Sequence, residues 1–234
     1  MAPRAVKGRR FQARALTARR PVDIIERMET ILLASASPRR RSLLGELGIP
    51  FDALATDFDE SVRDNLSPPE RVLVLAEDKA RTAAAADGPP GRKGAHRLVL
   101  GADTLVCLQE RGGFEQVMGK PDSRDAARSM IALLAGREHL VHTGLALLDT
   151  VSGLLWTARS DSRVRFAHLD PGEIEDYLDS GEWEGVAGGY RVQGRAAFHI
   201  ERIEGSWSGI VGLPMRELYG ILREAGCRPR PRGR

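Results

Sequence analysis

The stretch that decides the fold runs from residue 31 to residue 41 and reads Ile-Leu-Leu-Ala-Ser-Ala-Ser-Pro-Arg-Arg-Arg. Its first four residues form a short apolar run, which is typical of a buried strand. Ser37 and Pro38 then suit the N-cap and first-turn positions of a helix. Gly48 suits the left-handed position that commonly ends a helix. The stretch therefore predicts a strand, a loop of small residues and a helix that stops near residue 48.

Three guanidinium groups, at residues 39–41, fall in the first turn of this predicted helix. The aligned peptide dipoles already make that end positive, so the arrangement is unfavourable without an anion. A bound polyphosphate would reverse the sign. It would accept hydrogen bonds from the free backbone N–H groups, from the hydroxyls of Ser35 and Ser37, and from arginine. The alternative is a solvated basic turn, but the loop of small residues behind a buried strand favours the anion site.

Asp103 is the next candidate, because it lies inside the run 98–106, which is apolar on both faces as in a central strand. Burying a lone carboxylate is unfavourable unless a metal, a cation or a proton compensates its charge. The functional interpretation is a metal ligand or a general base. The structural alternative is a carboxylate that caps backbone amides near Thr104, and the residues alone leave both interpretations open.

Four further side chains are weaker candidates when each is taken alone. Glu60 ends an acidic cluster and could supply a second oxygen ligand to Mg²⁺, although such clusters are usually solvated loops. Lys79, on a predicted helix, and Lys120, between Gly119 and Pro121, could bind phosphate or serve solubility. The amide of Gln193 could hydrogen-bond a nucleobase edge or stabilise a glycine-rich turn.

The remaining pattern interleaves helices and strands, which predicts a mixed α/β sheet rather than a purely parallel one. A capping box at residues 67–70 opens a second helix, and a third helix follows Asp122 and stops at Gly136. The other expected elements are strands at 140–148 and 154–169, a helix from 170, a hairpin of strands 198–203 and 207–211, and a helix at 214–225. His142 and His199 fall in strand patterns and are interpreted as core or edge residues.

Composition favours one large domain, with room for two lobes, in a reducing compartment such as the cytoplasm. The chain has 234 residues, 42% of them apolar, and we find no apolar run of the roughly 20 residues that a membrane span needs. The basic start lacks the apolar segment of a secretory signal. The two cysteines, Cys107 and Cys227, offer neither a disulfide framework nor a zinc-ligand spacing.

The net charge of +3 misleads about partners, because residues 1–28 carry eight basic and two acidic side chains. The rest of the chain is therefore acidic by three charges, despite the basic residues 228–234. We expect a basic leader over 1–28, disordered or upstream of a true start at Met28, a domain over 29–227 and a basic tail over 228–234. We find no continuous basic stripe in the sequence, so we expect no stable nucleic-acid complex. We also expect no membrane partner.

Several segments together resemble the Maf family of nucleotide pyrophosphatases, over about residues 30–226. The motifs that carry the resemblance are Ala34-Ser35-Ala36-Ser37-Pro38-Arg39-Arg40, Gly101-Ala102-Asp103-Thr104, Gly119-Lys120-Pro121, Tyr190-Arg191-Val192-Gln193-Gly194 and Val211-Gly212-Leu213-Pro214. The resemblance implies a two-lobed α/β fold of the kind shared with inosine triphosphatases, with a mixed sheet, flanking helices and a central cleft. It also implies a homodimer that hydrolyses nucleoside triphosphates to monophosphate and pyrophosphate.

By position, the resemblance also assigns roles to individual residues. Asp103 matches the proton acceptor and, with Glu60, the ligands of a divalent cation, Mg²⁺ or Mn²⁺. The matched phosphate contacts are Ser35, Arg39, Arg40, Lys79 and Lys120, and the matched base-selecting positions are Arg39, Thr104 and Gln193. Glutamine at 193 is similar to the subgroup that acts on dTTP and UTP, whereas the 7-methyl-GTP subgroup carries an acidic residue in this loop.

Two alternatives to a dTTP and UTP pyrophosphatase stay open at this point. One is a pyrophosphatase for modified or non-canonical nucleotides such as 7-methyl-GTP. The other is a nucleic-acid-binding or cell-division regulator without turnover, which the basic leader suggests.

Overall fold

A computed structural model of the chain describes residues 29–56, 63–89, 95–109 and 115–227, and the structural statements below concern these residues. The predicted leader over 1–28, the predicted tail over 228–234 and the candidate ligand Glu60 lie outside them. Within the described ranges, no helix has both the length and the apolar character needed to cross a bilayer.

Seven strands and six α-helices are found in the described ranges. The strands are β1 (Ile31–Ala34), β2 (Phe51–Ala53), β3 (Leu98–Gln109), β4 (Glu115–Met118), β5 (Glu138–Asp149), β6 (Leu155–Phe166) and β7 (Ile200–Glu204). The helices are α1 (Pro38–Glu46), α2 (Pro68–Asp87), α3 (Arg124–Leu134), α4 (Pro171–Asp179), α5 (Trp207–Val211) and α6 (Met215–Glu224), with 3₁₀ turns η2 (Ala187–Gly189) and η3 (Arg195–His199).

All seven strands belong to one sheet in the order β2-β1-β3-β5-β6-β7, with β4 paired to β3. The β1–β2 and β1–β3 pairs are parallel, and the other pairs are antiparallel. The prediction of a mixed sheet is therefore confirmed.

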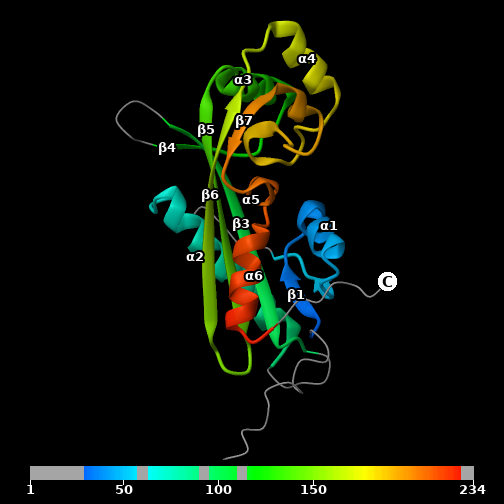
Figure 1. The fold of residues 1–234 in the computed structure, drawn as a ribbon, viewed down its shortest axis with the longest axis vertical. Helices are drawn as coiled ribbons and strands as arrows, with labels where there is room; N and C mark the ends of the chain where they lie inside the picture. Colours follow the sequence, from blue (N-terminus) through cyan, green and yellow to red (C-terminus); the bar gives the residue numbers. More distant parts are fainter. Residues whose placement is uncertain (1–28, 57–62, 90–94, 110–114, 228–234) are drawn as a thin grey trace, which may run out of the picture.

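The long strands β3, β5 and β6 run through two lobes (Figure 1). The lower lobe in that view adds β1, α1 and α6 to them, and the upper lobe adds β4, β7, α3 and α4. Each of the three long strands has 12 residues, enough to serve both lobes. The two-lobed α/β fold expected from the sequence is confirmed.

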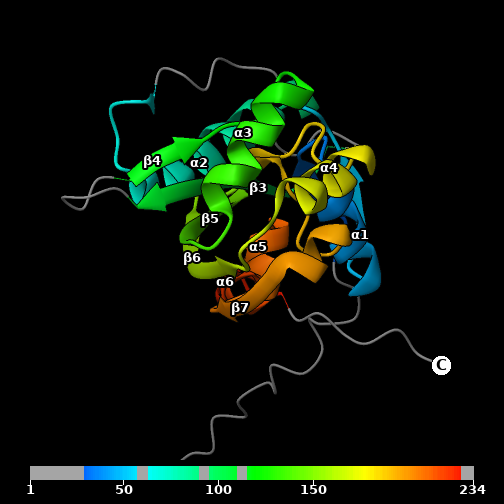
Figure 2. The same ribbon diagram turned by 90° about the horizontal axis from the view of Figure 1, so that it is seen from above.

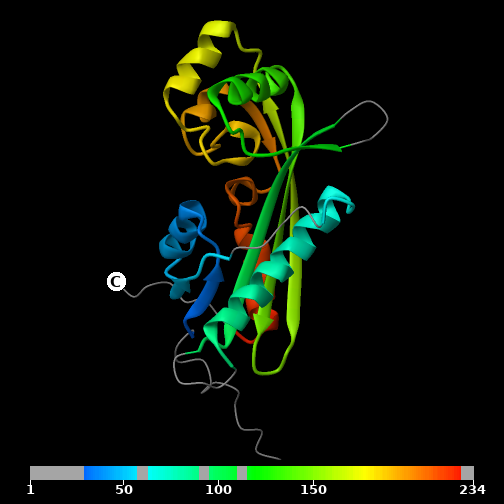
Figure 3. The same cartoon turned by 180° about the vertical axis from the view of Figure 1, so that it is seen from behind.

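Helices cover both faces of the sheet. On one face, α2 packs the small side chains of Ala76, Ala80 and Ala83 against the sheet (Figure 3). On the other face, α1, α3, α4 and α6 bury the larger apolar core, and Figure 2 shows α2 and α1 on opposite sides of β3. Burial of this apolar surface is the main force that holds the layers together.

Two glycines let α2 lie directly on the sheet. A Cβ atom at Gly101 in β3 would lie 2.0 Å from the backbone oxygen of Ala76, and one at Gly144 in β5 would lie 2.3 Å from that of Val72. Any larger side chain would push the helix away. The close approach places Lys79, in the middle of α2, over β3.

Near the start of the fold, α1 and α2 have the capping residues that the sequence predicts. Ser37 caps α1, its Oγ accepting from Arg40 N at 3.5 Å, and Pro38 is the first helical residue. Gly48 has φ 69°, the left-handed conformation expected of it. The predicted start of α2 is also confirmed, because Glu70 accepts from the backbone N–H of Ser67 at 3.3 Å.

One predicted strand is wrong, and the strand predicted from residue 198 begins later, because His199 ends the 3₁₀ turn η3 and β7 starts at Ile200. Residues 207–211 form the short helix α5 rather than the second strand of a hairpin. Ser206 caps this helix by accepting from Gly209 N at 3.0 Å, and Gly212, at φ 117°, ends it. These caps outweigh the β-propensity of Trp207 and the neighbouring branched residues. The pattern also missed β2 and β4, which are short and gain their order by pairing with longer strands.

Candidate active site

A gap along one edge of β3 defines the site. On this edge β1 pairs with β3 up to Gly101, and β4 pairs with it from Val106 onward. Between them, residues 102–105 have no strand neighbour on that edge in the described part of the chain. This bare edge borders a cleft of about 590 Å³ between the lobes.

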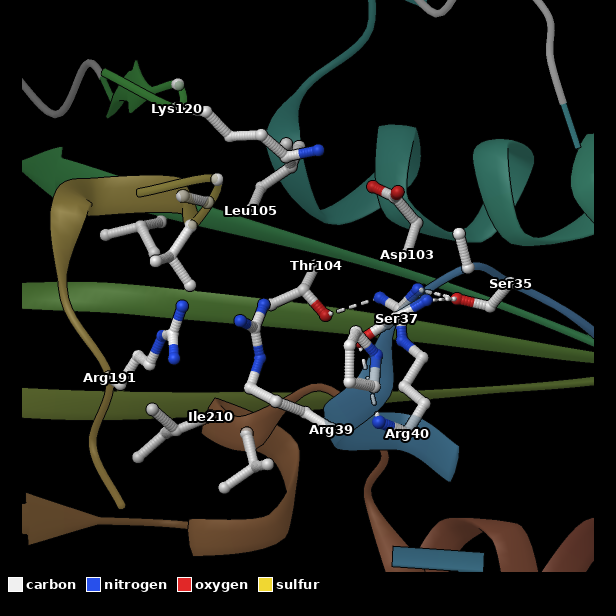
Figure 4. Close-up of a pocket in the computed structure, with 18 of the residues that line it drawn as sticks. Ser35, Ser37, Arg39, Arg40, Asp103, Thr104, Leu105, Lys120, Arg191 and Ile210 are labelled. Carbon is white, nitrogen blue, oxygen red and sulfur yellow. Dashed lines mark hydrogen bonds between the residues drawn. The ribbon is translucent and has the colours of Figure 1, made fainter. Parts of the chain in front are cut away.

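Eight of the nine site residues predicted from the sequence line this one cleft, which brings together segments up to 158 positions apart. They are Ser35, Arg39, Arg40, Lys79, Asp103, Thr104, Lys120 and Gln193. Figure 4 shows the cleft with most of them labelled. The ninth, Glu60, lies outside the described residues. The buried acid and the arginine-rich helix start therefore share a cavity.

Asp103 and Lys79 form a nearly buried ion pair at the cleft. Asp103 Oδ1 lies 2.5 Å from Lys79 Nζ, and the side chains are 7% and 12% exposed. The other carboxylate oxygen, Oδ2, is buried and has no hydrogen-bond partner among the described residues. Because a buried anionic oxygen is unfavourable without a donor or a cation, Oδ2 is positioned to bind a cation or accept a proton.

Arg40 organises the wall of the cleft through three hydrogen bonds. Its guanidinium donates to Ser35 Oγ at 3.1 Å, to Thr104 Oγ1 at 3.1 Å and to the backbone oxygen of Gly212 at 2.8 Å (Figure 4). Thr143, which sequence reasoning missed, lies with its Oγ1 3.0 Å from Thr104 Oγ1 and donates to a backbone oxygen of α5. Charged hydrogen bonds of this kind fix side-chain positions strongly, so α1, β3 and α5 are linked behind the cleft.

Arg39 faces the cleft without a hydrogen bond or ion pair in the described ranges. Its guanidinium and that of Arg191 extend into the same space (Figure 4). Burial, then the charges of Arg40 and Arg191, lower the pKa of Arg39 from its ordinary value. Arg191 Nε is buried and has no hydrogen-bond partner in the ranges that the structure describes. An anion between Arg39 and Arg191 would relieve both their repulsion and their lost hydration.

Arg191 is a cleft residue that sequence reasoning missed. It lies in the Tyr190-to-Gly194 motif, in which Gln193 is the side chain expected to contact the ligand, because an amide can hydrogen-bond a nucleobase. A basic side chain two residues from a proposed base contact was the available signal. Arg191 therefore joins Arg39 and Arg40 at the cleft, whereas Arg41, the third guanidinium expected there, does not line it.

Lys120 and Gln193 lie toward the opening. Lys120 follows β4 and is exposed, and it lines the same cleft as Leu105 (Figure 4). Gln193 is also exposed and makes no hydrogen bond within the ranges described. Among the described residues neither side chain has a hydrogen-bond or ion-pair partner, so both are available to a ligand.

One observation indicates that the residues at the cleft could hold a divalent cation. Asp103 Oδ2 is a buried carboxylate oxygen without a hydrogen-bond partner in the described part of the chain. Hard cations such as Mg²⁺ and Mn²⁺ prefer carboxylate oxygens, water and phosphate.

A cleft in which several guanidinium and ammonium groups face one buried carboxylate is the arrangement expected of an α/β protein of the nucleotide-hydrolysing class. The sequence comparisons agree, and the chain belongs to the Maf-like protein family, which matches residues 30–225.

Several relatives are similar over nearly their whole length. A dTTP/UTP pyrophosphatase of Treponema denticola is 41% identical over 203 residues, which is 86% of this chain and 99% of the relative. A dTTP/UTP pyrophosphatase of Moorella thermoacetica is 45% identical over 195 residues, or 83% and 94% of the two chains. The solved structure of the Staphylococcus aureus Ham1 protein aligns at a TM-score of 0.40 and 11% identity over 84% of this chain and 97% of its own. The family assignment rests on the sequence matches, not on this distant alignment.

Proposed function

We propose that this protein is a nucleoside triphosphate pyrophosphatase that hydrolyses dTTP and UTP to the monophosphate and pyrophosphate. The relatives that match it over more than 80% of its length carry that activity in their names. The single observation that carries the proposal is the cleft itself, in which the buried Asp103 and the cations of α1, α2 and the loop after β4 face one space.

Asp103 is proposed to accept the proton of the attacking water. Lys79 already contacts Oδ1, so Oδ2, which has no partner among the described residues, is the atom available for this proton. Water attacks the α-phosphorus, the bond from that phosphorus to the bridging oxygen breaks, and pyrophosphate leaves. A positioned general base of this kind contributes about 10²–10⁴ to the rate.

A divalent cation, Mg²⁺ or Mn²⁺, is proposed to be held by Asp103 and the triphosphate, with Glu60 as a further ligand. When bound, it supplies charge neutralisation at the phosphates and activation of water. Glu60 enters this proposal by its position in the sequence alone.

The basic side chains are proposed to have two different roles, charge neutralisation and positioning. Arg39, Arg191, Lys79 and Lys120 neutralise charge on the phosphates, where removal of one preorganised partner costs about 10²–10³ in rate. Arg40 acts chiefly by holding Ser35 and Thr104 in place, because three hydrogen bonds to the cleft wall already engage its guanidinium. Ser35 and the first turn of α1 complete the phosphate site.

Base selection is proposed to rest on Arg39, Thr104 and Gln193. Thr104 lies on the bare edge of β3, and Gln193 lies at the opening with its amide unengaged in the described ranges. An amide offers both a donor and an acceptor, and it can therefore match the carbonyl and N–H groups of a uracil or thymine edge.

The deciding experiment measures pyrophosphate release from dTTP, UTP, CTP, GTP and 7-methyl-GTP, each with Mg²⁺ and with Mn²⁺. We expect equal amounts of pyrophosphate and monophosphate, fastest from dTTP and UTP. Faster turnover of 7-methyl-GTP would replace the substrate assignment by the modified-nucleotide alternative. Release of orthophosphate instead of pyrophosphate would refute the reaction.

The regulator alternative is tested by deleting residues 1–27. We expect the shortened chain to hydrolyse dTTP at the rate of the full chain and to lose any retention on DNA. A full chain that binds DNA and hydrolyses no nucleotide would establish the alternative instead.

We further propose that the enzyme is a homodimer that acts in the cytoplasm, where free nucleoside triphosphates are found. The resemblance to the family supports both points, and the 84% exposed side chain of Phe198 is a large apolar group that an interface would cover. Light scattering coupled to size-exclusion chromatography is expected to give twice the mass of the chain, and the mass of one chain would contradict the dimer.

A further inference from the structure

A second cluster of metal-ligating side chains lies beside the cleft but does not line it. Cys107 on β3, Glu115 on β4 and His142 on β5 bring one sulfur, one carboxylate oxygen and one ring nitrogen within 4.8 Å of one another. The cysteine and the histidine are buried, and the side chain of Glu115 is 18% exposed. Solvent therefore reaches the cluster from the side of Glu115.

Sequence spacing could not reveal this cluster, because its members are 8 and 27 residues apart and meet only through strand pairing. In the register of the sheet, Cys107 lies opposite Val117 on β4, two residues from Glu115, and opposite Leu140 on β5, two residues from His142. Positions two apart share a face of a strand. Three neighbouring strands therefore direct these side chains to the face covered by α2.

The hydrogen bonds of His142 leave a place for a cation. Its Nδ1 lies 2.7 Å from Asp161 Oδ1, and its Nε2 lies 3.0 Å from Glu115 Oε2. A neutral imidazole carries one proton, so donation to Asp161 leaves Nε2 with a lone pair that faces the lone pairs of a carboxylate. A proton or a metal ion must lie between these two atoms. Histidine ligands commonly donate their other ring N–H to a carboxylate, as here to Asp161.

The donor set selects the metal. Sulfur, imidazole nitrogen and one carboxylate oxygen are ligands of Zn²⁺, whereas Mg²⁺ and Mn²⁺ prefer oxygen alone. Three protein ligands leave one position for water. Cys107 makes no hydrogen bond within the part of the chain described, so its sulfur is not engaged elsewhere. Burial, then the charge of Glu115, raise the pKa of this thiol to about 12, and a bound cation would compensate both effects.

We propose that Cys107, Glu115 and His142 form a zinc site on the α2 face of the sheet, separate from the nucleotide cleft. The site ties the outer end of β4 to β3 and β5. Because Lys120 follows the last residue of β4 by two positions, zinc would also steady the strand that leads to this cleft residue.

The test uses the full-length chain, stripped of metal with a chelator, and Co²⁺ as a spectroscopic probe. We expect about one equivalent of Co²⁺ to give a thiolate-to-cobalt charge-transfer band and intense tetrahedral visible bands, both removed by added Zn²⁺. Absence of the thiolate band in the wild-type protein would overturn the proposal without any variant.

Variants locate the site. Cys107→Ser should lose the charge-transfer band, and Cys227→Ser, the matched control at the other cysteine, should keep it. Asp161→Asn should weaken Zn²⁺ binding about 10- to 100-fold, as expected when the partner of a histidine ligand is removed. Asp103→Asn should leave the cobalt spectrum unchanged. A spectrum that follows Asp103 or Cys227 instead of Cys107 would refute the assignment.

Discussion

The replacement Asp103→Asn tests the role of the buried acid most directly. It keeps the shape of the side chain and an oxygen that can accept from Lys79, but removes the negative charge. It also turns the proton-accepting carboxylate into an amide. We expect the variant to fold, to bind nucleotide and to turn over very slowly.

The size of the effect follows from two losses at the same atoms. Loss of a general base costs about 10²–10⁴ in rate, and loss of an electrostatic partner of the cation adds to it. We therefore expect kcat to fall by at least about 10³, which corresponds to about 4 kcal/mol in the activation barrier. Stability changes less. The ion pair with Lys79 at 2.5 Å becomes a charged hydrogen bond, and we expect a loss of about 1–3 kcal/mol.

The assay combines three measurements on wild type and variant. Pyrophosphate release at saturating dTTP gives kcat, equilibrium titration with dTTP and Ca²⁺ in place of Mg²⁺ gives affinity, and urea unfolding gives stability. If Asp103 accepts the proton of the attacking water, kcat falls far more than affinity or stability does.

Asp149→Asn is the matched control. Asp149 is also buried and accepts from Arg97 at 2.8 and 3.0 Å, but it lies at the far end of β5 and does not line the cleft. Burial alone would raise its pKa, yet hydrogen bonds from Arg97 and two backbone amides hold that pKa below the usual value. The control should lose similar stability and keep its kcat. Wild-type kcat in Asp103→Asn, or an equal loss of kcat in both variants, would refute the role given to Asp103.

Three further results are expected. Arg191→Gln should lower kcat/KM for dTTP about 10- to 100-fold in steady-state kinetics, because one cation facing the phosphates is lost, and an unchanged value would remove Arg191 from the site. Gly144→Ala should lower the free energy of urea unfolding by about 1–3 kcal/mol, because the new Cβ would lie 2.3 Å from the oxygen of Val72; unchanged stability would mean that α2 shifts freely. Burial lowers the pKa of His139 to about 4, so the unfolded chain takes up its proton first as pH falls from about 6.5. Stability is full above pH 6.5 and should decrease by about 3 kcal/mol on reaching pH 4, and a His139→Gln variant with the same pH slope would contradict this.

The sequence predicted those parts of the fold that local chemistry determines. Ser37, Pro38 and Gly48 mark both ends of α1, and the apolar run around Asp103 marks β3. The failure at residues 207–211 has the opposite cause. There, branched and aromatic residues favour a strand, and only the capping by Ser206 and the turn at Gly212 decide for a helix.

The site was predictable as a set of residue types and not as a geometry. The pairing of Lys79 with Asp103 depends on the approach of α2 to β3, which glycines far apart in the chain permit. The hydrogen bonds from Arg40 to Thr104 and Gly212 likewise join segments that no local pattern relates. Arg191 was missed because its proximity to Arg39 exists only in the folded chain.

The bare edge of β3 between β1 and β4 has a consequence for the behaviour of the protein in concentrated solution. Unpaired strand edges invite intermolecular β-sheet formation, but this one spans only residues 102–105 and ends at a neighbouring strand on either side. A strand from another molecule would have only the backbone groups of these four residues to pair with, and the arginines of the cleft lie beside them. The protein can therefore keep backbone amides and carbonyls open to a small ligand without inviting polymerisation, and a short, uncharged amide compound could use the same notch as an inhibitor scaffold.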